Sequence, residues 1–347
     1  MVGGGTPDTT VSSLWNGDIQ WFTPTEVGHQ KYVSKSARTI TQLGLQKSSA
    51  KKLPAGSILL SSRATIGECS IAQRECTTNQ GFQNLIPKKD TNNEFLYYLA
   101  QTKKHHFIKY ASGSTFLEIS NSEIKKTKCT VPGTEEQTQI AAFLSALDDR
   151  IAVQNKIISK YETLIKGLCD MIFPSIEGSI LPLKAIASIE KGQQINGMSL
   201  AKTGKYYYLN GGIAPSGYID DYNTSEETIS ISEGGNSCGF VSYNLQKFWS
   251  GGHCYTLKIM AEQCRSKYLF FYLKYKEKDI MQLRVGSGLP NIQKKSLENF
   301  NVKLPNYKKQ CFVECVFEVV TAKKEIENAL LERFQSQKKF LLSKMFI

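Results

Sequence analysis

Residues 113–119 have the sequence Gly-Ser-Thr-Phe-Leu-Glu-Ile, and residues 286–292 repeat the pattern as Gly-Ser-Gly-Leu-Pro-Asn-Ile. The offset of 173 residues holds in both directions, because it also aligns Val131-Pro132 with Leu304-Pro305 and the aromatic segment 95–99 with 268–272. A repeat this long exceeds the period of about 20 to 50 residues that is typical of solenoids. The sequence therefore predicts an internal duplication with pseudo-two-fold symmetry and two similar binding faces.

A long helix is predicted after each copy of the repeated segment. Helix-initiating residues Thr134-Glu135-Glu136-Gln137 follow Val131-Pro132-Gly133. Apolar residues then recur at steps of four and three, with Gln154 as the one interruption, as a coiled-coil seam requires: Ile140, Leu144, Leu147, Ile151, Ile158, Tyr161, Ile165, Leu168 and Ile172. We expect a helix of about 38 residues that ends at Phe173-Pro174.

The second copy predicts a helix of the same length, from about Lys308 to Phe346. Its seam is less regular and comprises Val313, Phe317, Val320, Ile326, Leu330, Leu331, Phe334, Leu341 and Met345. Because the period of about 3.5 residues favours packing of helix on helix, we expect the two helices to pair antiparallel into a coiled coil that joins the two halves. The alternative is that each helix packs only on its own domain.

The globular segments have a different composition. Short β-branched and aromatic runs predict strands at 57–62, 206–209, 228–232 and 254–257, and helices are expected at 94–110 and 266–283. Each half is therefore predicted to be mixed α/β. The resulting organisation is domain 1 at 1–131, long helix 1 at 132–175, domain 2 at 176–303 and long helix 2 at 304–347.

The chain is basic, with 43 Lys and Arg against 31 Asp and Glu, a net charge of +12. Residues 1–131 carry +7 and residues 176–303 carry +4, so both globular segments could bind a polyanion such as DNA. The nine cysteines include no Cys-x-x-Cys pair, which is typical of reduced thiols. No apolar stretch long enough for a membrane span and no signal peptide is visible, so we expect a cytoplasmic protein.

Short motifs follow one another in a characteristic order. In the first half these are Gly4-Gly5-Thr6-Pro7, residues 15–24 (WNGDIQWFTP), residues 61–67 (SSRATIG), residues 78–82 (TNQGF) and Gly113-Ser114-Thr115. The second half has residues 210–218 (NGGIAPSGY), 232–236 (SEGGN) and 286–290 (GSGLP). With the long helices, this order resembles the specificity (S) subunit of a Type I restriction-modification system over essentially the whole chain.

The resemblance implies two target-recognition domains that each recognise one half of a bipartite site in double-stranded DNA. It implies that the paired helices set the spacer and dock methyltransferase (M) subunits, with two expected, and that restriction (R) subunits join through that complex. It also implies no catalytic activity and no cofactor in this chain, with S-adenosylmethionine and ATP bound by the partner subunits. Consistent with this, the sequence has no Asn-Pro-Pro-Tyr motif and no phosphate-binding loop, and no metal site is expected.

One segment departs from the family pattern. The second domain opens with residues 181–192 (LPLKAIASIEKG), whereas only Met1-Val2-Gly3 precedes the equivalent glycines of the first domain. If the missing dozen or so residues form a strand, the first domain has an unpaired sheet edge. This predicts a truncated or rearranged reading frame and a first domain that is the less stable of the two.

Candidate DNA contacts are polar residues in loops, because Asn, Gln, Ser, Arg and Lys are the side chains that reach base edges and phosphates. Base contacts are predicted in the first domain for Ser62, Arg63, Thr65, Asn79, Gln80 and Ser114, with Lys31, Lys35, Lys51 and Lys52 on phosphates. In the second domain the predicted base contacts are Asn210, Ser232, Glu233, Asn236, Ser237 and Ser287, with Lys202, Lys205 and Lys294 on phosphates. Arg63 is the strongest candidate, since bidentate arginine to guanine is the commonest specific contact.

Three other functions remain compatible with the sequence. The chain could be a free-standing DNA-binding or regulatory protein, or a truncated and non-functional variant of an S subunit. It could also be a nuclease that uses Glu123 and Lys125, although a Glu-x-Lys pair arises easily by chance in a lysine-rich chain.

Overall fold

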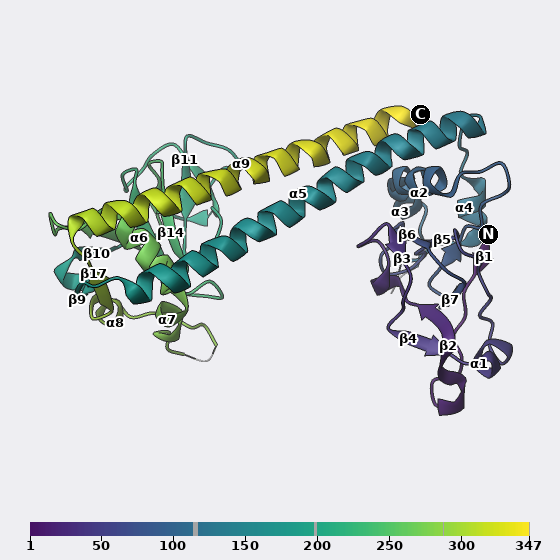
Figure 1. Ribbon diagram of the computed structural model, residues 1–347, viewed down its shortest axis with the longest axis horizontal. Helices are drawn as coiled ribbons and strands as arrows, with labels where there is room; N and C mark the ends of the chain where they lie inside the picture. The colour runs from purple at the N-terminus through teal and green to yellow at the C-terminus, as the bar shows by residue number, and fades with distance from the viewer. Residues whose placement is uncertain (114–116, 198–199, 287, 347) are drawn as a thin grey trace. The chain divides into compact units, whose positions relative to one another are not determined.

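The computed structural model describes residues 1–347 except 114–116, 198–199, 287 and 347. The chain forms two compact units, and the division falls within both of its long helices. Unit 1 comprises Met1–Asn155 with Ala329–Ile347, and unit 2 comprises Lys156–Asn328. Figure 1 shows the elements of each unit, from purple at the N-terminus to yellow at the C-terminus.

Unit 1 contains short strands and helices around a mixed α/β core. Its strands are β1 (Val2–Gly3), β2 (Trp15–Phe22), β3 (Tyr32–Val33), β4 (Arg38–Ile40), β5 (Ile58–Leu60), β6 (Cys69–Ala72), β7 (Cys76–Thr78) and β8 (Gln83–Asn84). Its shorter helices are α1 (Gln42–Gln46), α2 (Asn93–Thr102), α3 (Lys104–Lys109) and α4 (Asn121–Lys126). The strand orders are β4-β2-β7, β3-β6-β5 and β1-β8. Strands β5 and β6 are fully buried because α2 packs on them, so they have no polar face.

Unit 2 has the larger continuous sheet. Its strands are β9 (Ser179–Pro182), β10 (Ala187–Lys191), β11 (Tyr206–Leu209), β12 (Gly217–Ile219), β13 (Thr228–Ser232), β14 (Val241–Asn244), β15 (Trp249–Ser250), β16 (Cys254–Ile259) and β17 (Asn301–Leu304). Its shorter helices are α6 (Ser266–Tyr275), α7 (Glu277–Gln282) and α8 (Lys294–Glu298). Strands β10-β16-β13-β14 form an antiparallel sheet, beside the smaller sheets β12-β11-β15 and β17-β9.

Helices α5 (Thr134–Ser175) and α9 (Tyr307–Met345) each contribute to both units. In unit 2, the ring of Phe173 stacks on Phe317 at 5.6 Å, and Lys324 pairs with Glu162 at 2.9 Å. In unit 1, Lys338 pairs with Asp148 at 2.5 Å. Also in unit 1, the guanidinium of Arg150 lies over the ring of Phe334 at 5.2 Å. In each unit, the contact with the higher residue number on α5 has the lower number on α9, so the helices pair antiparallel.

The long helices also pack on the domains, so the two packing modes considered from sequence occur together. Leu144 of α5 is fully buried in the unit 1 core, and Phe317 of α9 is buried in the unit 2 core. Every predicted seam residue of α5 is at least half-buried. Pro174, expected to end that helix, lies inside its last turn.

The prediction that Ile326 and Leu330 belong to the seam of α9 is wrong. Ile326 and Leu330 are exposed, whereas Lys324 is half-buried against α5. The reason is register: seven residues after the buried Phe317 comes Lys324, so a strict heptad places a lysine inside and the two aliphatic residues outside.

The duplication is confirmed by secondary structure. Helix α2 begins at Asn93 and α6 at Ser266, while α5 begins at Thr134 and α9 at Tyr307, so the offset of 173 is preserved at both pairs. The helices predicted at 94–110 and 266–283 are each broken into two at equivalent places, after Thr102 and after Tyr275. The two units therefore share one framework.

Candidate nucleic-acid interface

In unit 1, residues 61–67 form a tight loop that follows the buried strand β5. The backbone N–H of Gly67 donates to the carbonyl of Ser61 at 2.9 Å, and the N–H of Ile119 donates to the carbonyl of Ser62 at 3.0 Å. Gly67 has φ +82°, a left-handed conformation that glycine adopts without strain. The repeated segment that ends at Ile119 therefore closes onto this loop.

Unit 2 repeats the arrangement at residues 232–239. The N–H of Gly239 donates to the carbonyl of Ser232 at 2.8 Å, and the N–H of Ile292 donates to the carbonyl of Glu233 at 2.8 Å. Gly239 also has a positive φ, +91°. We refer to residues 61–67 and 232–239 as the paired loops. They share these two backbone hydrogen bonds, although the second loop is one residue longer and the side chains differ.

The paired loops differ most at the residue that contacts the repeated segment. In unit 1, Arg63 bridges to Glu118, and its Nε and Nη2 both donate to one carboxylate oxygen, at 3.1 and 2.5 Å. In unit 2 the same backbone bridge joins Gly234 to Asn291, with no charged pair between the two. Arg63 is partly exposed, so the ion pair orients its guanidinium at the surface of the loop.

Buried polar atoms without a partner mark the same position in both loops. Ser62 Oγ and Glu233 Oε2 are two of the three buried side-chain atoms that lack a hydrogen bond in the described part of the chain. The other oxygen of Glu233 accepts from Lys191 Nζ at 2.6 Å and from Tyr255 Oη at 3.0 Å. Buried polar atoms are normally satisfied, so this shared position is a functional candidate.

A hollow of about 600 Å³ lies beside the unit 2 loop, and Glu233 lines it. Three predicted residues meet there, Asn210, Glu233 and Ser237. Sequence reasoning missed other lining residues, notably Lys191 and His253, whose Nδ1 is 3.6 Å from Glu233 Oε2. The signal that could have found His253 is the Gly251-Gly252 pair before it, because glycines allow close approach of the backbone.

The remaining predicted residues of unit 2 lie in varied surroundings. The hydroxyls of Ser232 and Ser237 both donate to the carbonyl of Gly211, at 2.5 Å. The exposed residues are Asn236, Lys202, Lys205 and Lys294, the last of which is 3.8 Å from Glu298. Ser287 is outside the described residues, as is Ser114 of unit 1.

In unit 1, several predicted base contacts make structural hydrogen bonds. Thr65 Oγ1 donates to the carbonyl of Pro24 at 3.3 Å, and Asn79 Oδ1 accepts from the N–H of Gly81 at 2.9 Å. Gln80 is exposed and accepts from Thr6. Thr65 and Gln80 therefore combine exposure with a fixed geometry.

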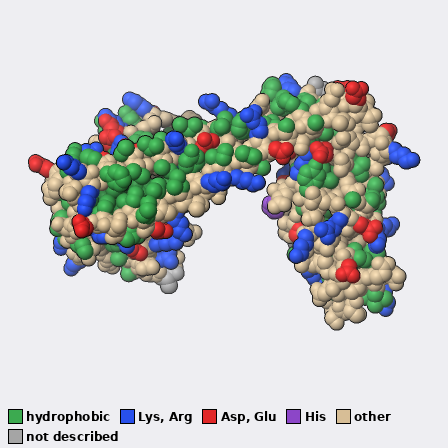
Figure 2. All heavy atoms as spheres, in the orientation of Figure 1, with side chains coloured by type: hydrophobic (Ala, Val, Ile, Leu, Met, Phe, Trp, Pro, Cys, Tyr) green, Lys and Arg blue, Asp and Glu red, His purple; other side chains and the backbone are tan. Residues whose placement is uncertain are grey.

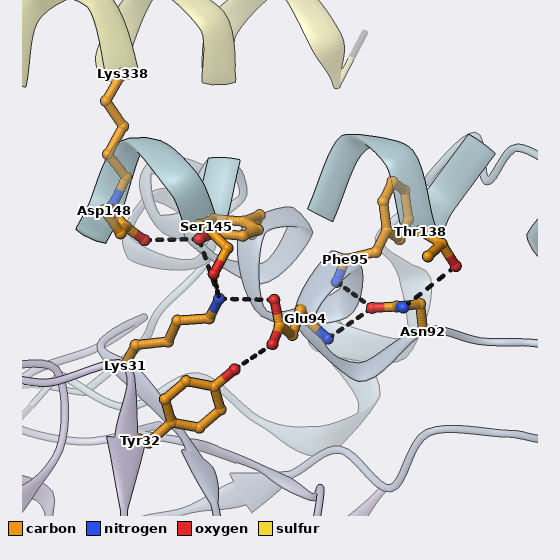
Figure 3. A network of polar contacts seen from close by, with 10 residues as sticks. Lys31, Tyr32, Asn92, Glu94, Phe95, Thr138, Ser145, Asp148 and Lys338 are labelled. Carbon is orange, nitrogen blue, oxygen red and sulfur yellow. Dashed lines mark hydrogen bonds and ion pairs between the residues drawn. The ribbon is translucent and has the colours of Figure 1, made fainter. Parts of the chain in front are cut away.

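Lys31 has a structural environment that its sequence did not indicate. Figure 3 shows its Nζ at the centre of a polar network, where it donates to Glu94 at 2.8 Å, Ser145 at 2.9 Å and Tyr98 at 3.3 Å. Only 11% of its side chain is exposed. These three partners occupy the ammonium group, so Lys31 is not available to contact a phosphate and its predicted role is wrong.

The other predicted phosphate contacts of unit 1 are at the surface. Lys35 and Lys51 are exposed, and Lys52 is exposed while it pairs with Glu75 at 2.7 Å. Figure 2 shows basic side chains on the visible face of both units, interspersed with acidic ones. Such mixed but positive surfaces favour a polyanion through counterion release.

Metal-binding and membrane-spanning features are absent from the described residues. These residues contain no group of three His, Cys, Asp or Glu arranged to hold a metal, and no helix long and apolar enough to cross a bilayer. Burial raises the pKa of the thiols of Cys69 and Cys264 to about 12, so both are unreactive near neutral pH. Glu123, the acidic residue of the Glu-x-Lys pair considered for a nuclease, accepts a hydrogen bond from Lys126 Nζ on α4 at 2.6 Å.

Comparisons with known proteins agree on one family. The family model described as Type I restriction modification DNA specificity domain matches residues 2–163 and 179–334. The specificity subunit of the Type I restriction enzyme MjaIX from Methanocaldococcus jannaschii is 41% identical over 46% of this chain and 39% of its own length. That of EcoprrI from Escherichia coli is 22% identical over 91% of this chain and 83% of its own length.

Solved structures share the fold. The S subunit of a Type I restriction-modification system from M. genitalium matches with a TM-score of 0.68 and 19% identity, over 100% of this chain and 93% of that one. A chain from a study of Type I complex assembly matches with a TM-score of 0.62 and 16% identity, over 99% and 94%. By sequence, the chain spans only about a third to three fifths of three of its curated relatives.

Proposed function

Because the chain belongs to the Type I restriction-modification DNA specificity family, we propose that it is the DNA-recognition subunit of such a complex. Each unit recognises one half of a bipartite site in double-stranded DNA. The observation that carries this proposal is the pair of loops, which share two backbone hydrogen bonds and a backbone bridge but have different side chains. Two units with the same fold and different loop side chains can recognise two half-sites of different sequence.

Arg63 is the proposed base-recognising residue of unit 1. Its guanidinium is oriented by Glu118, and a guanidinium donates in pairs to O6 and N7 of guanine in the major groove. Glu233 is the corresponding candidate in unit 2. It lines the hollow, its Oε2 has no hydrogen bond although its other oxygen is bonded, and a carboxylate oxygen accepts from the amino group of cytosine. Exposed lysines, among them Lys35, Lys51 and Lys202, position the DNA backbone without selecting sequence.

The long helices are the proposed docking surface for two methyltransferase subunits and the element that sets the spacer. Phe312, Val319 and Ile326 of α9 are 59%, 52% and 66% exposed, and their spacing of seven residues places them on one face of the helix. Figure 2 shows a broad area of hydrophobic side chains where the helices cross the visible face of unit 2. Exposed apolar stripes of this kind are typical of interfaces.

The proposal assigns no catalysis to this chain. Methyl transfer with S-adenosylmethionine and ATP-dependent restriction belong to the methyltransferase and restriction subunits of the proposed cytoplasmic complex. This division of labour is supported by the family to which the chain belongs, whose model describes a DNA specificity domain.

The test is co-expression with the methyltransferase subunit of the same system, followed by single-molecule sequencing for methylated adenines. We expect a bipartite motif that requires this chain. Arg63→Ala should relax one half of the motif, and Glu233→Gln the other half, by about 1–3 kcal/mol of discrimination at one position each. Matched controls are Arg74→Ala and Glu226→Gln, which make the same changes at exposed residues outside the paired loops.

Two outcomes would refute the proposal. One is a soluble complex that leaves host DNA without a motif dependent on this chain. The other is a motif whose two halves both change with either single variant, since that would show that the units do not recognise separate half-sites.

A further inference from the structure

His253 stands in unit 2 at a position where unit 1 has a glycine. The N–H of Glu233 donates to the carbonyl of His253 at 2.9 Å, and the equivalent bond in unit 1 joins Ser62 to the carbonyl of Gly81 at 2.8 Å. A Cβ added at Gly81 would lie 2.9 Å from Cγ of Pro24, so unit 1 has no room for a side chain there. Of the two equivalent positions, only the one in unit 2 therefore presents a polar group.

Gly234 shows the opposite exchange, because it stands where unit 1 has Arg63. Its backbone bridge to Asn291 is equivalent to the bridge that Arg63 makes in unit 1. A Cβ added at Gly234 would have the carbonyl oxygen of Pro290 as its nearest atom, at 3.5 Å, which is an ordinary contact, and its φ is not positive. The backbone does not require glycine here, and the lack of a side chain leaves the hollow of about 600 Å³ open.

His253 and Glu233 line this hollow together and are held in place from behind. Nδ1 of His253 is 3.6 Å from Oε2 of Glu233, which is beyond hydrogen-bond distance, so Oε2 stays unbonded. Lys191 and Tyr255 both donate to the other carboxylate oxygen and so fix the direction of Oε2. Asn210 Oδ1 accepts from the backbone N–H of His253 at 3.0 Å and fixes the backbone that carries the imidazole.

We propose that His253 is a further base-recognising residue of unit 2 and that it recognises one C·G base pair together with Glu233. In the major groove, N4 of cytosine donates and O6 of the paired guanine accepts, and the two atoms lie about 3 Å apart because they are bonded to each other. A carboxylate oxygen and an imidazole nitrogen 3.6 Å apart form two parallel bonds to such a pair. The His253 side chain is 63% exposed and therefore accessible. The inference rests on the proposed function, since it requires that unit 2 binds DNA.

The test uses the complex with the co-expressed methyltransferase subunit, and the methylated motif is the readout. His253→Ala should reduce discrimination about tenfold at the same base pair that Glu233→Gln relaxes, and should leave the half-site of unit 1 unchanged. His253→Asn keeps a donor near the position of Nδ1 and should restore most of the discrimination. The matched control is His105→Ala, which changes an exposed histidine outside the paired loops and should leave the whole motif unchanged.

A second variant tests whether the hollow must stay open. Gly234→Leu places an apolar side chain beside His253 and Glu233, at a position where the backbone accommodates a Cβ. Because that side chain would keep the base edge from the two polar groups, methylation of sites that carry the unit 2 half-site should fall about tenfold. Hydrogen–deuterium exchange of α6 should stay as in the unchanged chain, which separates loss of recognition from loss of folding.

Several outcomes would overturn this inference while leaving the DNA-recognition function in place. They are a motif that Glu233→Gln changes and His253→Ala does not, a His253→Ala effect at a different base pair, an asparagine variant no better than the alanine variant, or full methylation by a folded Gly234→Leu chain. Weaker methylation with unchanged discrimination in His253→Ala would show a merely structural role and would likewise overturn it. A host motif that does not depend on this chain would instead refute the proposed function itself.

Discussion

Units 1 and 2 anchor their long helices with the same three hydrogen bonds. In unit 1, buried Gln137 donates to the carbonyls of Asp90 and Pro132, at 3.2 and 2.9 Å, and accepts from the N–H of Asn92 at 2.9 Å. Gln310 of unit 2 makes all three bonds at the offset of 173, to Gln263, Pro305 and Arg265. A single amide satisfies three backbone groups, which is why this position tolerates so little change between the copies.

A neighbouring position shows the opposite behaviour. The N–H of Phe95, in the first turn of α2, donates to Asn92 at 3.0 Å, a local helix cap. The equivalent N–H of Tyr268 donates to Glu314 of α9 at 3.0 Å, and Arg265 pairs with the same carboxylate. The counterpart of Glu314 in α5 is Ala141. The same backbone N–H in the first turn of the helix is therefore bonded by the local N-cap residue in unit 1 and by a side chain of the long helix α9 in unit 2.

The largest expected effect breaks the shared anchor. Gln137→Ala and Gln310→Ala should each destabilise their own unit by about 3 kcal/mol, because each removes three buried hydrogen bonds worth about 1 kcal/mol apiece. Hydrogen–deuterium exchange of α2 and α6 measures the two units separately. The exposed Gln139→Ala is the control, and a difference between the two variants above about 1 kcal/mol would contradict the equivalence of the two anchors.

A smaller effect sharpens the contrast between the two caps. Glu314→Ala should destabilise unit 2 by about 2 kcal/mol, since it leaves the Tyr268 N–H without a partner and the Arg265 guanidinium with Tyr307 alone. Asn92→Ala should destabilise unit 1 by about 1 kcal/mol, the usual value of an N-cap. The same exchange measurement applies, with Glu314→Gln and Asn92→Asp as variants that retain the cap. An Asn92→Ala effect larger than that of Glu314→Ala would reverse the comparison.

The smallest effect is a difference in pH dependence. At equivalent sites, unit 1 has Glu94 with Lys31, and unit 2 has Lys267 with Glu318 on α9. Burial tends to raise the pKa of Glu94, but hydrogen bonds from Lys31 and Tyr32 outweigh it and lower the pKa. The hydrogen bond to Glu318 raises the pKa of Lys267.

The signs follow from these directions. The Glu94 contribution to stability is present above its unfolded pKa and is lost as pH falls through the lower folded pKa. The Lys267 contribution is present below its unfolded pKa and is lost as pH rises through the higher folded pKa. We expect Glu94→Gln to flatten the acid limb of unit 1 and Lys267→Gln the alkaline limb of unit 2, each by less than about 1 kcal/mol. Hydrogen–deuterium exchange in each unit, measured across pH, tests both variants. An effect of Glu94→Gln only at alkaline pH, or of Lys267→Gln only at acid pH, would contradict the prediction.

Much of the fold could be predicted because it depends on local or periodic patterns. The cap residues at Thr134, the seam from Ile140 to Ile172 and the offset of 173 all lie in the sequence, and the structure follows them. The seam of α9 was harder because Ile326 and Leu330 are aliphatic but out of register. Only the pairing of Lys324 with Glu162 shows that a lysine occupies the inner position.

The candidate site was predicted less completely. The sequence placed Arg63 and Glu233 in loops, and these loops share two backbone hydrogen bonds in the structure. It could not identify Lys31 as an internal ion-pair residue, since its partners Glu94 and Ser145 lie 63 and 114 residues away. His253 was likewise missed because its approach to Glu233 depends on the pairing of β13 with β16.

The sequence by itself determined the family, the duplication and the long helices, because motif order and periodicity are one-dimensional properties of the chain. Only the tertiary structure decided which polar side chains are free to meet a ligand and which sheet edges are covered. Those properties depend on contacts between residues far apart in sequence, and equivalent positions such as Val131 and Leu304 can differ in exposure although their local sequences match.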